Sequence, residues 1–186
     1  RLIDPNLPDF AGSKVNTCIN NVMTEYNAGK GDKLTQLVFC DIGIHKKTTG
    51  FSVYEEIRDK LTTRGIPADA IAIAQDYNTE AKKKILEEQI NSGDIAVCIA
   101  STEKLGVGSN VQKRLVALHN LDTPWRPRDL EQRIGRIERQ GNLNDKVRVY
   151  NYSTIDSFDL FMWETLYRKA GFIVQAKTDP KNAARE

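Results

Sequence analysis

The residues with the clearest chemical potential lie in the stretch 122–141, where an amide and two arginines recur along one side of an expected helix. Pro127 suits the first position of that helix, because its missing N–H group has no partner there in any case. At 100° per residue, Gln132, Arg136 and Arg139 form one stripe. Guanidinium groups aligned in this way match the oxygen atoms of phosphate groups. The spacing therefore predicts a helix face that presents an amide and two fixed cations to whatever lies opposite.

The other side of the same helix carries an apolar stripe of Leu130, Ile134 and Ile137, which we expect to bury against the domain. Gly141 suits the residue just past the helix end. A solvated basic face is the plainer interpretation of the arginine stripe, because arginines are mostly exposed. The sequence around the stripe is needed to choose between these two interpretations.

A second stretch that could bind an anion follows the apolar run 95–100, which has the composition of a buried strand. The hydroxyl of Thr102 can donate to a phosphate, and Gly106 and Gly108 allow backbone N–H groups to approach an anion closely. Two glycines alone would predict only a turn. Their place between a buried strand and the arginine helix favours an anion-binding loop.

A third candidate is the loop 43–50, which carries Lys46 and Lys47 and follows the compact apolar run 34–42. Loops that leave the carboxyl ends of parallel strands are where α/β sheets bind ligands. A solvated loop is the alternative interpretation. The lysine run 82–84 lies on an expected helix, and we interpret it as ordinary helix surface.

The arginine helix resembles the last motif of superfamily 2 helicases and translocases, with the pattern Gln132-Arg133-x-Gly135-Arg136-x-x-Arg139. This resemblance implies that Arg136 and Arg139 are arginine fingers, which reach the γ-phosphate of an ATP held mainly by another domain. It also implies that Gln132 orients the nucleotide or the attacking water and couples the two lobes.

Two further blocks resemble the Swi2/Snf2 branch of that superfamily. One is Asp122-x-x-Trp125-x-Pro127, and the other is the fifth helicase motif, matched by Ser101, Thr102, Gly106, Gly108 and Asn110. In that motif the Ser/Thr side contacts the nucleic-acid backbone and the glycine side lines the nucleotide cleft. The region of Lys46 and Lys47 corresponds to one that borders the nucleic-acid track.

The closest pattern is that of the bacterial Swi2/Snf2 ATPases, including the type associated with RNA polymerase. Glu138 stands where chromatin remodellers usually have His, and Arg133 stands where they often have Ala. Both departures favour a bacterial or phage-type translocase over a eukaryotic remodeller.

Composition sets the broad class of the chain. Its 186 residues are 40% hydrophobic and 28% charged, which is typical of a soluble globular domain. The net charge of +2 creates no general basic field, so nucleic-acid binding would depend on local patches. No apolar run approaches the roughly 18 residues of a membrane span. The start at Arg1, without Met, is expected for a segment of a longer protein.

The cysteines and histidines predict no metal site. Cys18, Cys40 and Cys98 are widely spaced in apolar segments, which is typical of buried, reduced cysteines in a cytosolic protein. A zinc site would need close pairs such as Cys-x-x-Cys. His45 and His119 have no Cys or Asp partner at ligand spacing. We therefore expect a cytoplasmic protein without a structural metal.

Apolar periodicity divides the chain into alternating elements. We expect an extended lead-in at 1–14, a domain at 15–176 and a polar tail at 177–186. Within the domain, the expected helices are 15–28, 51–64, 79–92, 127–140 and 154–170, and the expected strands are 34–42, 71–74, 95–100, 114–121 and 147–152. The last strand alternates as a half-exposed edge. The last helix carries more aromatic surface than one packed face needs, so we expect part of it to meet a neighbour.

This order predicts an α/β fold with a mostly parallel sheet and helices on both faces. The resemblance implies a RecA-like helicase C-terminal domain, the second lobe of a Swi2/Snf2-type ATPase. The chain has neither a Gly-x-x-x-x-Gly-Lys-[Ser/Thr] loop nor an Asp-Glu-x-x motif. ATP with Mg would therefore be shared with a missing N-terminal lobe, and we expect the fragment alone to be inactive.

The implied partners are that lobe and double-stranded DNA, along which ATP-driven closure would move the protein. The competing class is a degenerate lobe that serves as a non-catalytic docking module for nucleic acid or protein. The intact set of Gln132, Arg136 and Arg139 counts against it, because docking has no need of both fingers. A complete small nucleotide-binding enzyme fails for lack of a phosphate loop.

Overall fold

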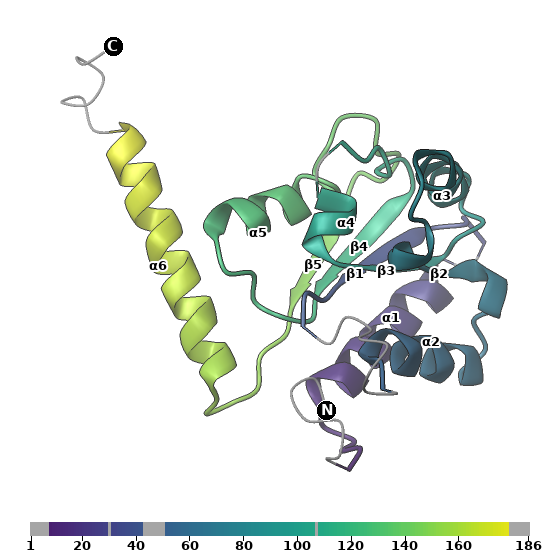
Figure 1. Ribbon diagram of the computed structural model, residues 1–186, viewed down its shortest axis with the longest axis horizontal. Coiled ribbons are helices and arrows are strands. Elements are labelled where there is room, and N and C mark those ends of the chain that lie inside the picture. Colours follow the sequence, from purple (N-terminus) through teal and green to yellow (C-terminus); the bar gives the residue numbers. More distant parts are fainter. Residues whose placement is uncertain (1–7, 30, 43–50, 107, 179–186) are drawn as a thin grey trace.

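A five-stranded parallel sheet forms the centre of the molecule (Figure 1). The computed structural model describes residues 8–29, 31–42, 51–106 and 108–178. The elements are α1 (Lys14–Ala28), β1 (Thr35–Phe39), α2 (Val53–Thr63), η1 (Ala68–Ala70), β2 (Ile71–Ile73), η2 (Ala74–Asp76), α3 (Glu80–Ser92), β3 (Val97–Ala100), α4 (Thr102–Gly106), β4 (Leu115–Asn120), α5 (Pro127–Ile134), β5 (Arg148–Asn151) and α6 (Phe158–Thr178). The strand order is β2-β3-β1-β4-β5, and each neighbouring pair is parallel. The expected parallel α/β fold is confirmed.

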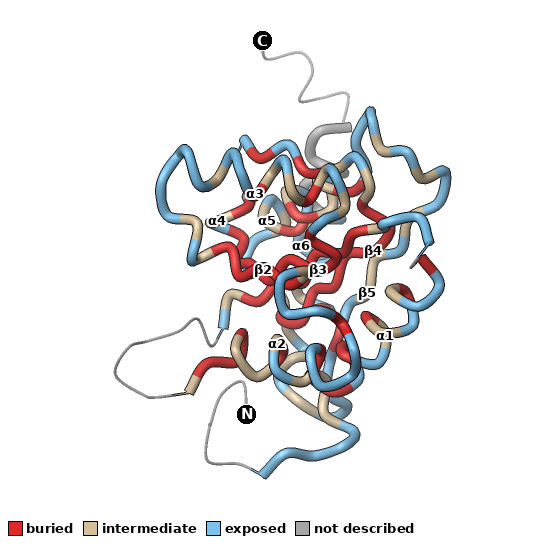
Figure 2. Tube along the Cα trace, turned by 90° about the vertical axis from the view of Figure 1, so that its right-hand side faces the viewer, coloured by how far each residue is buried: buried red, intermediate tan, exposed pale blue. Residues whose placement is uncertain are grey.

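Helices cover both faces of the sheet because its central strands are apolar on both sides. On β1, Val38 faces one core cluster, which contains side chains of α1 and α2. Leu37 and Phe39 face the other cluster, which contains side chains of α3 and α4. The alternation follows the two-residue period of a strand. Figure 2 shows the resulting band of buried residues along the strands.

The edge strand β5 differs from the central strands. Its residues are only half-buried or exposed, whereas every residue of β1, β3 and β4 is buried. The expected half-exposed edge strand is therefore confirmed.

Helix ends follow local sequence signals. Ser13 and Thr79 cap α1 and α3, since their side chains accept hydrogen bonds from Asn16 N and Lys82 N. Gly93 ends α3 with a φ of 82°, a left-handed conformation that glycine adopts without a steric penalty.

The last helix lies apart from the sheet and packs on α5 (Figure 1). Trp163 and Leu166 of α6 are buried against Leu130, and Ile134 packs at their edge. Trp163 also donates from Nε1 to the carbonyl oxygen of Tyr152, at 3.1 Å. The expected helix 154–170 in fact begins at Phe158 and continues to Thr178, into the segment expected as a polar tail.

Two further expectations concern the cysteines and membrane helices. All three cysteines, Cys18, Cys40 and Cys98, are buried and free. In the described part of the chain, no helix is long and apolar enough to cross a membrane.

Candidate functional site

The carboxyl ends of three neighbouring strands meet at one edge of the sheet. Phe39 of β1 is in register with Ala100 of β3 and with Asn120 of β4. The residues that follow these strands are therefore neighbours in space: Asp41 after β1, Thr102 after β3 and Asp122 after β4. Polar side chains from three distant parts of the sequence are gathered where α/β sheets bind ligands.

Arg133 of α5 joins these strand ends. Its side chain is fully buried and donates five hydrogen bonds. The acceptors are Thr102 Oγ1 at 2.7 Å, Asn120 Oδ1 at 3.1 Å, the Asp122 carbonyl at 3.0 Å, Asp41 Oδ2 at 2.7 Å and Asp122 Oδ1 at 2.9 Å. Below we call Arg133 with Asp41, Thr102, Asn120 and Asp122 the strand-end cluster. Its bonds use every nitrogen of the guanidinium group.

Thr102 uses both of its donors inside the cluster. Its backbone N–H donates to Asp41 Oδ1 at 2.6 Å, and its hydroxyl donates to Asp41 Oδ2 at 2.8 Å. The same hydroxyl accepts the bond from Arg133 Nε. Ser101 is also buried, and its hydroxyl accepts from Lys104 N at 3.3 Å and from Gln75 Nε2 at 3.4 Å. Both hydroxyls expected to face a ligand are thus engaged within the protein.

Asp122 fixes the chain as it leaves β1. Its Oδ2 accepts hydrogen bonds from the backbone N–H groups of Asp41 and Ile42, the second at 2.7 Å. Burial raises the pKa of the Asp122 carboxyl group above its usual value, while the neighbouring Arg133 guanidinium opposes that rise. The buried carboxylate therefore depends on Arg133 for its charge balance.

The arginine helix ends earlier than expected. The regular helix stops at Ile134, and Gly135 is its C-cap. Beyond it, Arg136 N donates to the Arg133 carbonyl at 3.1 Å and Ile137 N donates to the Ile134 carbonyl at 2.9 Å. These bonds close turns between residues three apart, which bring side chains three apart onto the same side. The expectation of one helix over 127–140 was wrong, and we call residues 135–140 the arginine turn.

Arg136 and Arg139 converge on one carbonyl oxygen because of this turn. Both donate from their Nη1 atoms to the oxygen of Ser109, at 2.7 Å and 3.2 Å. Burial, and after it the charge of Arg139, lowers the pKa of Arg136, while Glu87 raises it. Two mutually repelling cations thus share a neutral acceptor, the Ser109 carbonyl, in the segment that follows α4.

The apolar stripe of the arginine segment divides between two cores. Leu130 and Ile134 pack toward α6. Ile137 is 1% exposed and packs with the core under α3 and α4. The expected burial is confirmed for Leu130 and Ile137, whereas Ile134 is only partly buried because it lies at the border of the small α5–α6 cluster.

The remaining predicted residues are distributed around this site. Gly106 is the last residue of α4, and Gly108 has a φ of 84°, which a side chain would disfavour. The backbone carbonyl of Asn110 accepts from Asn91 Nδ2 at 2.6 Å, and the residue itself is exposed. Gln132 is half-buried on α5, one turn before Arg136. Lys46 and Lys47 lie outside the described residues.

Sequence reasoning missed the strongest interactions of the site. The helical wheel carries the signal for Arg133, because at 100° per residue it lies about 60° from Leu130 on the apolar side. Asp41 and Asp122 each follow a buried strand, and this position also favoured a place for both at the same edge of the sheet. The sequence gives no signal for the role of the Ser109 carbonyl, since every residue type has a backbone carbonyl group.

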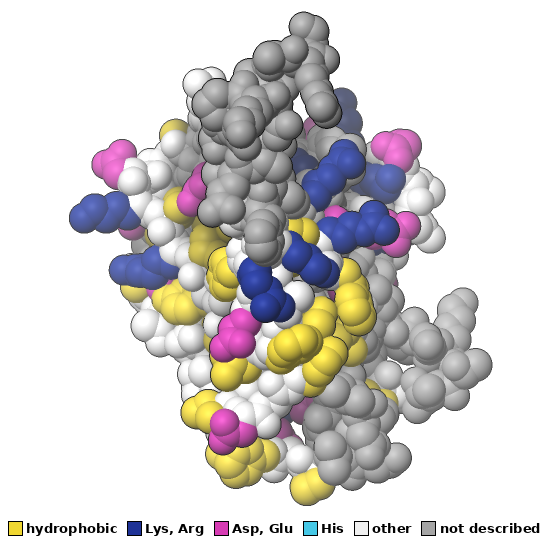
Figure 3. Space-filling model, turned by 90° about the vertical axis from the view of Figure 1, so that its left-hand side faces the viewer, with side chains coloured by type: hydrophobic (Ala, Val, Ile, Leu, Met, Phe, Trp, Pro, Cys, Tyr) yellow, Lys and Arg dark blue, Asp and Glu magenta, His cyan; other side chains and the backbone are white. Residues whose placement is uncertain are grey.

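An apolar groove of about 790 Å³ lies beside the strand-end cluster. Ile42, Thr123 and Tyr152, which follow β1, β4 and β5, contribute to its wall. Large exposed apolar side chains also line it: Phe10, Trp125, Ile155 and Phe158. Figure 3 shows hydrophobic side chains gathered on this side of the molecule, with Lys and Arg close by. The excess of aromatic surface expected for the last helix is therefore present at its start.

Metal ligands do not gather in the described residues. No group of three or more His, Cys, Asp or Glu side chains there could hold a metal ion.

Comparison with known proteins connects this geometry to a family. Residues 22–141 match the family described as "Helicase conserved C-terminal domain". The chain is 40% identical over 75 residues to "Defense against restriction protein B" of Escherichia phage P1, a match that covers 40% of this chain and 3% of that protein. It is also 40% identical over 89 residues to "Uncharacterized ATP-dependent helicase YqhH" of Bacillus subtilis (strain 168), covering 47% of this chain and 15% of that protein.

A solved structure has the same fold. The crystal structure of the C-terminal part of the Fun30 ATPase domain matches with a TM-score of 0.65 and 17% identity, over 86% of this chain and 48% of that one. The chain therefore spans a small part of the two sequence relatives and about half of this structure.

Proposed function

Because this chain belongs to the family of helicase conserved C-terminal domains, we propose that it is the second lobe of an ATP-dependent helicase or translocase and that it supplies two arginine fingers. Gln132, Arg136 and Arg139 would be its catalytic residues. ATP with Mg would be held mainly by an N-terminal lobe of the same protein. The ATP-dependent helicase named among the relatives supports the use of ATP.

The observation that carries the proposal is the convergence of Arg136 and Arg139 on the Ser109 carbonyl oxygen. Two guanidinium groups that reach one oxygen atom lie close enough together for the oxygens of a γ-phosphate to accept from both. The turn already holds the two forks side by side, so little reorganisation is needed when phosphate charge develops. Closure of the two lobes would bring both groups from Ser109 onto that charge.

The loop after β3 would line the nucleotide cleft through Gly106, Gly108 and Asn110. Gly108 supports this role, because it is exposed and its positive φ favours a residue without a side chain, which leaves the backbone open to a close approach.

The nucleic-acid track, for which we propose double-stranded DNA, would lie along the strand ends. Thr102 would form part of its floor, because its hydroxyl already donates to Asp41 Oδ2. The Ser101 hydroxyl accepts both of its hydrogen bonds, so its own O–H group would be the donor to a phosphate. Lys46 and Lys47 would supply the charge that attracts phosphate groups.

The N-terminal lobe would be the second partner. The exposed apolar side chains at the start of α6, such as Phe158, support a protein neighbour there. Free, buried cysteines such as Cys98 support a reducing, cytoplasmic setting.

The deciding experiment measures ATP hydrolysis by the full-length protein. Arg136→Ala and Arg139→Ala should each lower turnover by about 10³- to 10⁵-fold, the usual effect of an arginine finger. Arg136→Lys should not restore activity, because an ammonium group lacks the bidentate fork. Arg128→Ala is the control, since Arg128 is an exposed arginine on α5, the helix that precedes the arginine turn. Near-normal hydrolysis by folded Arg136→Ala would leave the chain as a non-catalytic docking module.

A further inference from the structure

We propose that Arg133 is a positioning residue that couples nucleic-acid binding at the strand ends to the two arginine fingers. The inference rests on the proposed function of those fingers. It assigns a role to a side chain that touches neither ligand. Arg133 acts through Thr102 on one side and through the arginine turn on the other.

The connection to the arginine turn is through the backbone. The Arg133 carbonyl accepts the hydrogen bond of Arg136 N, at 3.1 Å, in the first bond of the turn. A shift of Arg133 therefore changes where the turn begins. Since Arg136 and Arg139 follow directly, the same shift changes where both guanidinium groups point.

The connection to the loop after β3 is through the side chain. Arg133 Nε donates to the hydroxyl of Thr102, the first residue of α4. The arginine turn meets the same loop a second time at the Ser109 carbonyl. When the fingers leave Ser109 for a phosphate, the Arg133–Thr102 bond still holds α4 and the arginine segment together, and Gln112 Nε2 adds a bond to the Gln140 carbonyl at 3.3 Å.

The cluster is open to solvent at one member. Arg133 and Asp122 have side-chain exposures of 0% and 1%, whereas Asp41 is 31% exposed. Asp41 binds both Thr102 and Arg133 and stands at the end of the chain segment that enters the loop of Lys46 and Lys47. A ligand bound at the strand ends would move Asp41 first and Arg133 through it.

A second arginine in the chain provides a matched control. Arg148 pairs with the buried carboxylate of Glu25, which is 5% exposed, at 2.8 Å. Like Arg133 it balances a buried acid, although its own side chain is 62% exposed. It lies at the start of β5, away from the strand carboxyl ends, so its loss should not affect coupling.

The test compares ATP hydrolysis by the full-length protein with and without double-stranded DNA. Arg133→Lys keeps a cation beside Asp122 but cannot form the five bonds of the fork. We expect the maximal stimulation by DNA to fall roughly 2- to 30-fold, the range by which single substitutions change the coupling between two sites. The DNA concentration for half-maximal stimulation should stay the same, because Arg133 touches no DNA. Arg148→Lys should retain both values.

Equal losses with and without DNA would overturn the proposal, since a merely structural role lowers both rates together. Unchanged stimulation would also overturn it. If Arg133→Lys does not fold, the double variant Arg133→Met with Asp122→Asn removes the buried charges as a pair and allows the same measurement. Loss of hydrolysis in Arg136→Ala together with intact stimulation in Arg133→Lys would reject the coupling and keep the fingers.

Discussion

The strand-end cluster and the arginine turn use the same residue type, three positions apart, in opposite ways. Arg133 is fully buried and spends all of its donors on the protein. Arg136 is half-buried and Arg139 is exposed, and both donate to one backbone carbonyl. The first arginine has several partners with two carboxylates among them, whereas the other two share one backbone carbonyl as an acceptor.

This difference in burial and partners assigns stability to Arg133 and the proposed activity to Arg136 and Arg139 within a single motif. A buried cation is tolerated only where charge and hydrogen bonds compensate for lost hydration, and the cluster supplies both to Arg133. Cations that lie nearer the surface and donate to a backbone carbonyl can be reached by an anionic ligand. Removing the first arginine should therefore destabilise the domain strongly, and removing the others should change its stability little.

The largest expected effect on stability follows from Arg133→Ala. It leaves the buried Asp122 carboxylate without its cation, which costs about 3–5 kcal/mol in the free energy of unfolding. Arg136→Ala and Arg139→Ala should change that free energy by less than about 1 kcal/mol, since neither side chain is fully buried. Denaturant unfolding of the three variants measures the contrast. Equal losses in all three would show that the turn is structural as well.

The two isoleucines of the arginine segment sharpen the same contrast in apolar terms. Ile137 lies in the main core below α3 and α4, so Ile137→Ala should cost about 2–5 kcal/mol through a cavity. Ile134 is half-buried at the small α5–α6 cluster, so Ile134→Ala should lower the free energy of unfolding clearly less. Thermal melts of the two variants decide the order. A larger loss for Ile134→Ala would mean that α6 contributes more to stability than the sheet core does at this point.

A neutral buried network at His119 offers a comparison with the charged cluster. Gln36 Nε2 donates to the Val22 carbonyl, so its Oε1 is left to accept from His119 Nε2 at 3.0 Å. His119 Nδ1 then accepts from the Tyr152 hydroxyl at 2.8 Å. Burial lowers the pKa of His119 to about 3 from 6.5. The imidazole is therefore neutral, with its proton on Nε2.

This network predicts a loss of stability in acid. Between pH 6.5 and 3 His119 binds a proton in the unfolded state but stays neutral in the folded state. The stabilisation that neutral His119 gives the folded state is therefore complete above pH 6.5 and is lost as the pH falls toward 3. The slope should reach about 1.4 kcal/mol per pH unit. The raised pKa of Asp122 acts in the opposite sense, because the folded state takes up that proton more readily. The difference in slope between the wild type and His119→Gln, from urea unfolding at several pH values, isolates the histidine.

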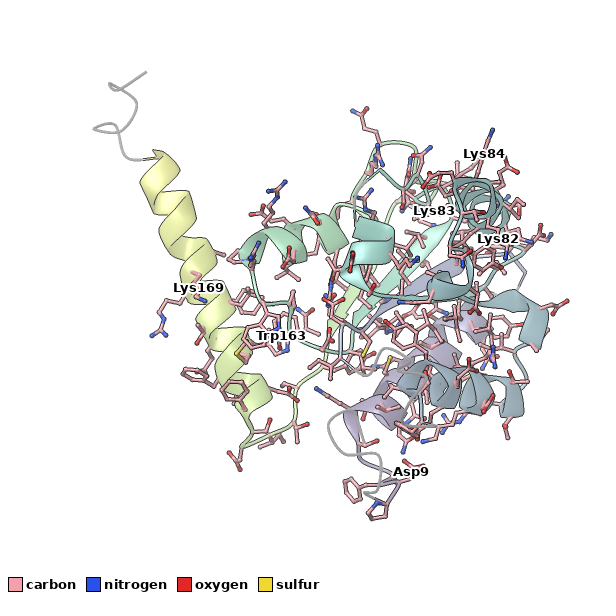
Figure 4. The ribbon with its side chains drawn as sticks, in the orientation of Figure 1. Asp9, Lys82, Lys83, Lys84, Trp163 and Lys169 are labelled. Atoms are coloured by element: carbon pink, nitrogen blue, oxygen red, sulfur yellow. The ribbon has the colours of Figure 1, made fainter. Side chains whose placement is uncertain are left out.

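The smallest effects should come from the lysine run on α3. Figure 4 shows Lys82, Lys83 and Lys84 on α3, away from α6. Lys83 pairs with Glu80 at 2.6 Å, but the two side chains are 42% and 90% exposed, so Lys83→Ala should cost less than about 0.5 kcal/mol.

We also expect the lysine run on α3 to have no effect on DNA binding. Replacing all three lysines with alanine should leave the affinity for double-stranded DNA and its salt dependence unchanged in a fluorescence-anisotropy titration. Replacing Lys46 and Lys47 should flatten the salt dependence, because fewer counterions are released. A flatter slope for the α3 variant would move the proposed track to the face of the sheet that α3 covers.

Much of the fold was predictable because its signals are local. The five buried or half-buried strands and the caps Ser13 and Thr79 follow from apolar runs and side-chain hydrogen bonds a few residues apart. The end of α5 was not predictable in the same way. Gly135 can continue a helix or cap it, and here the contacts of Arg136 and Arg139 with Ser109, far along the chain, accompany the cap.

The sequence by itself determined the alternation of strands and helices, the parallel sheet and the residue types able to bind phosphate. Only the tertiary structure decided which arginine serves which purpose. All three have the same chemistry, and their partners lie at the ends of strands that are distant along the chain. Whether a guanidinium is buried against Asp41 and Asp122 or left beside Ser109 depends on how those strand ends meet in space, because burial and charge pairing are properties of neighbours in three dimensions.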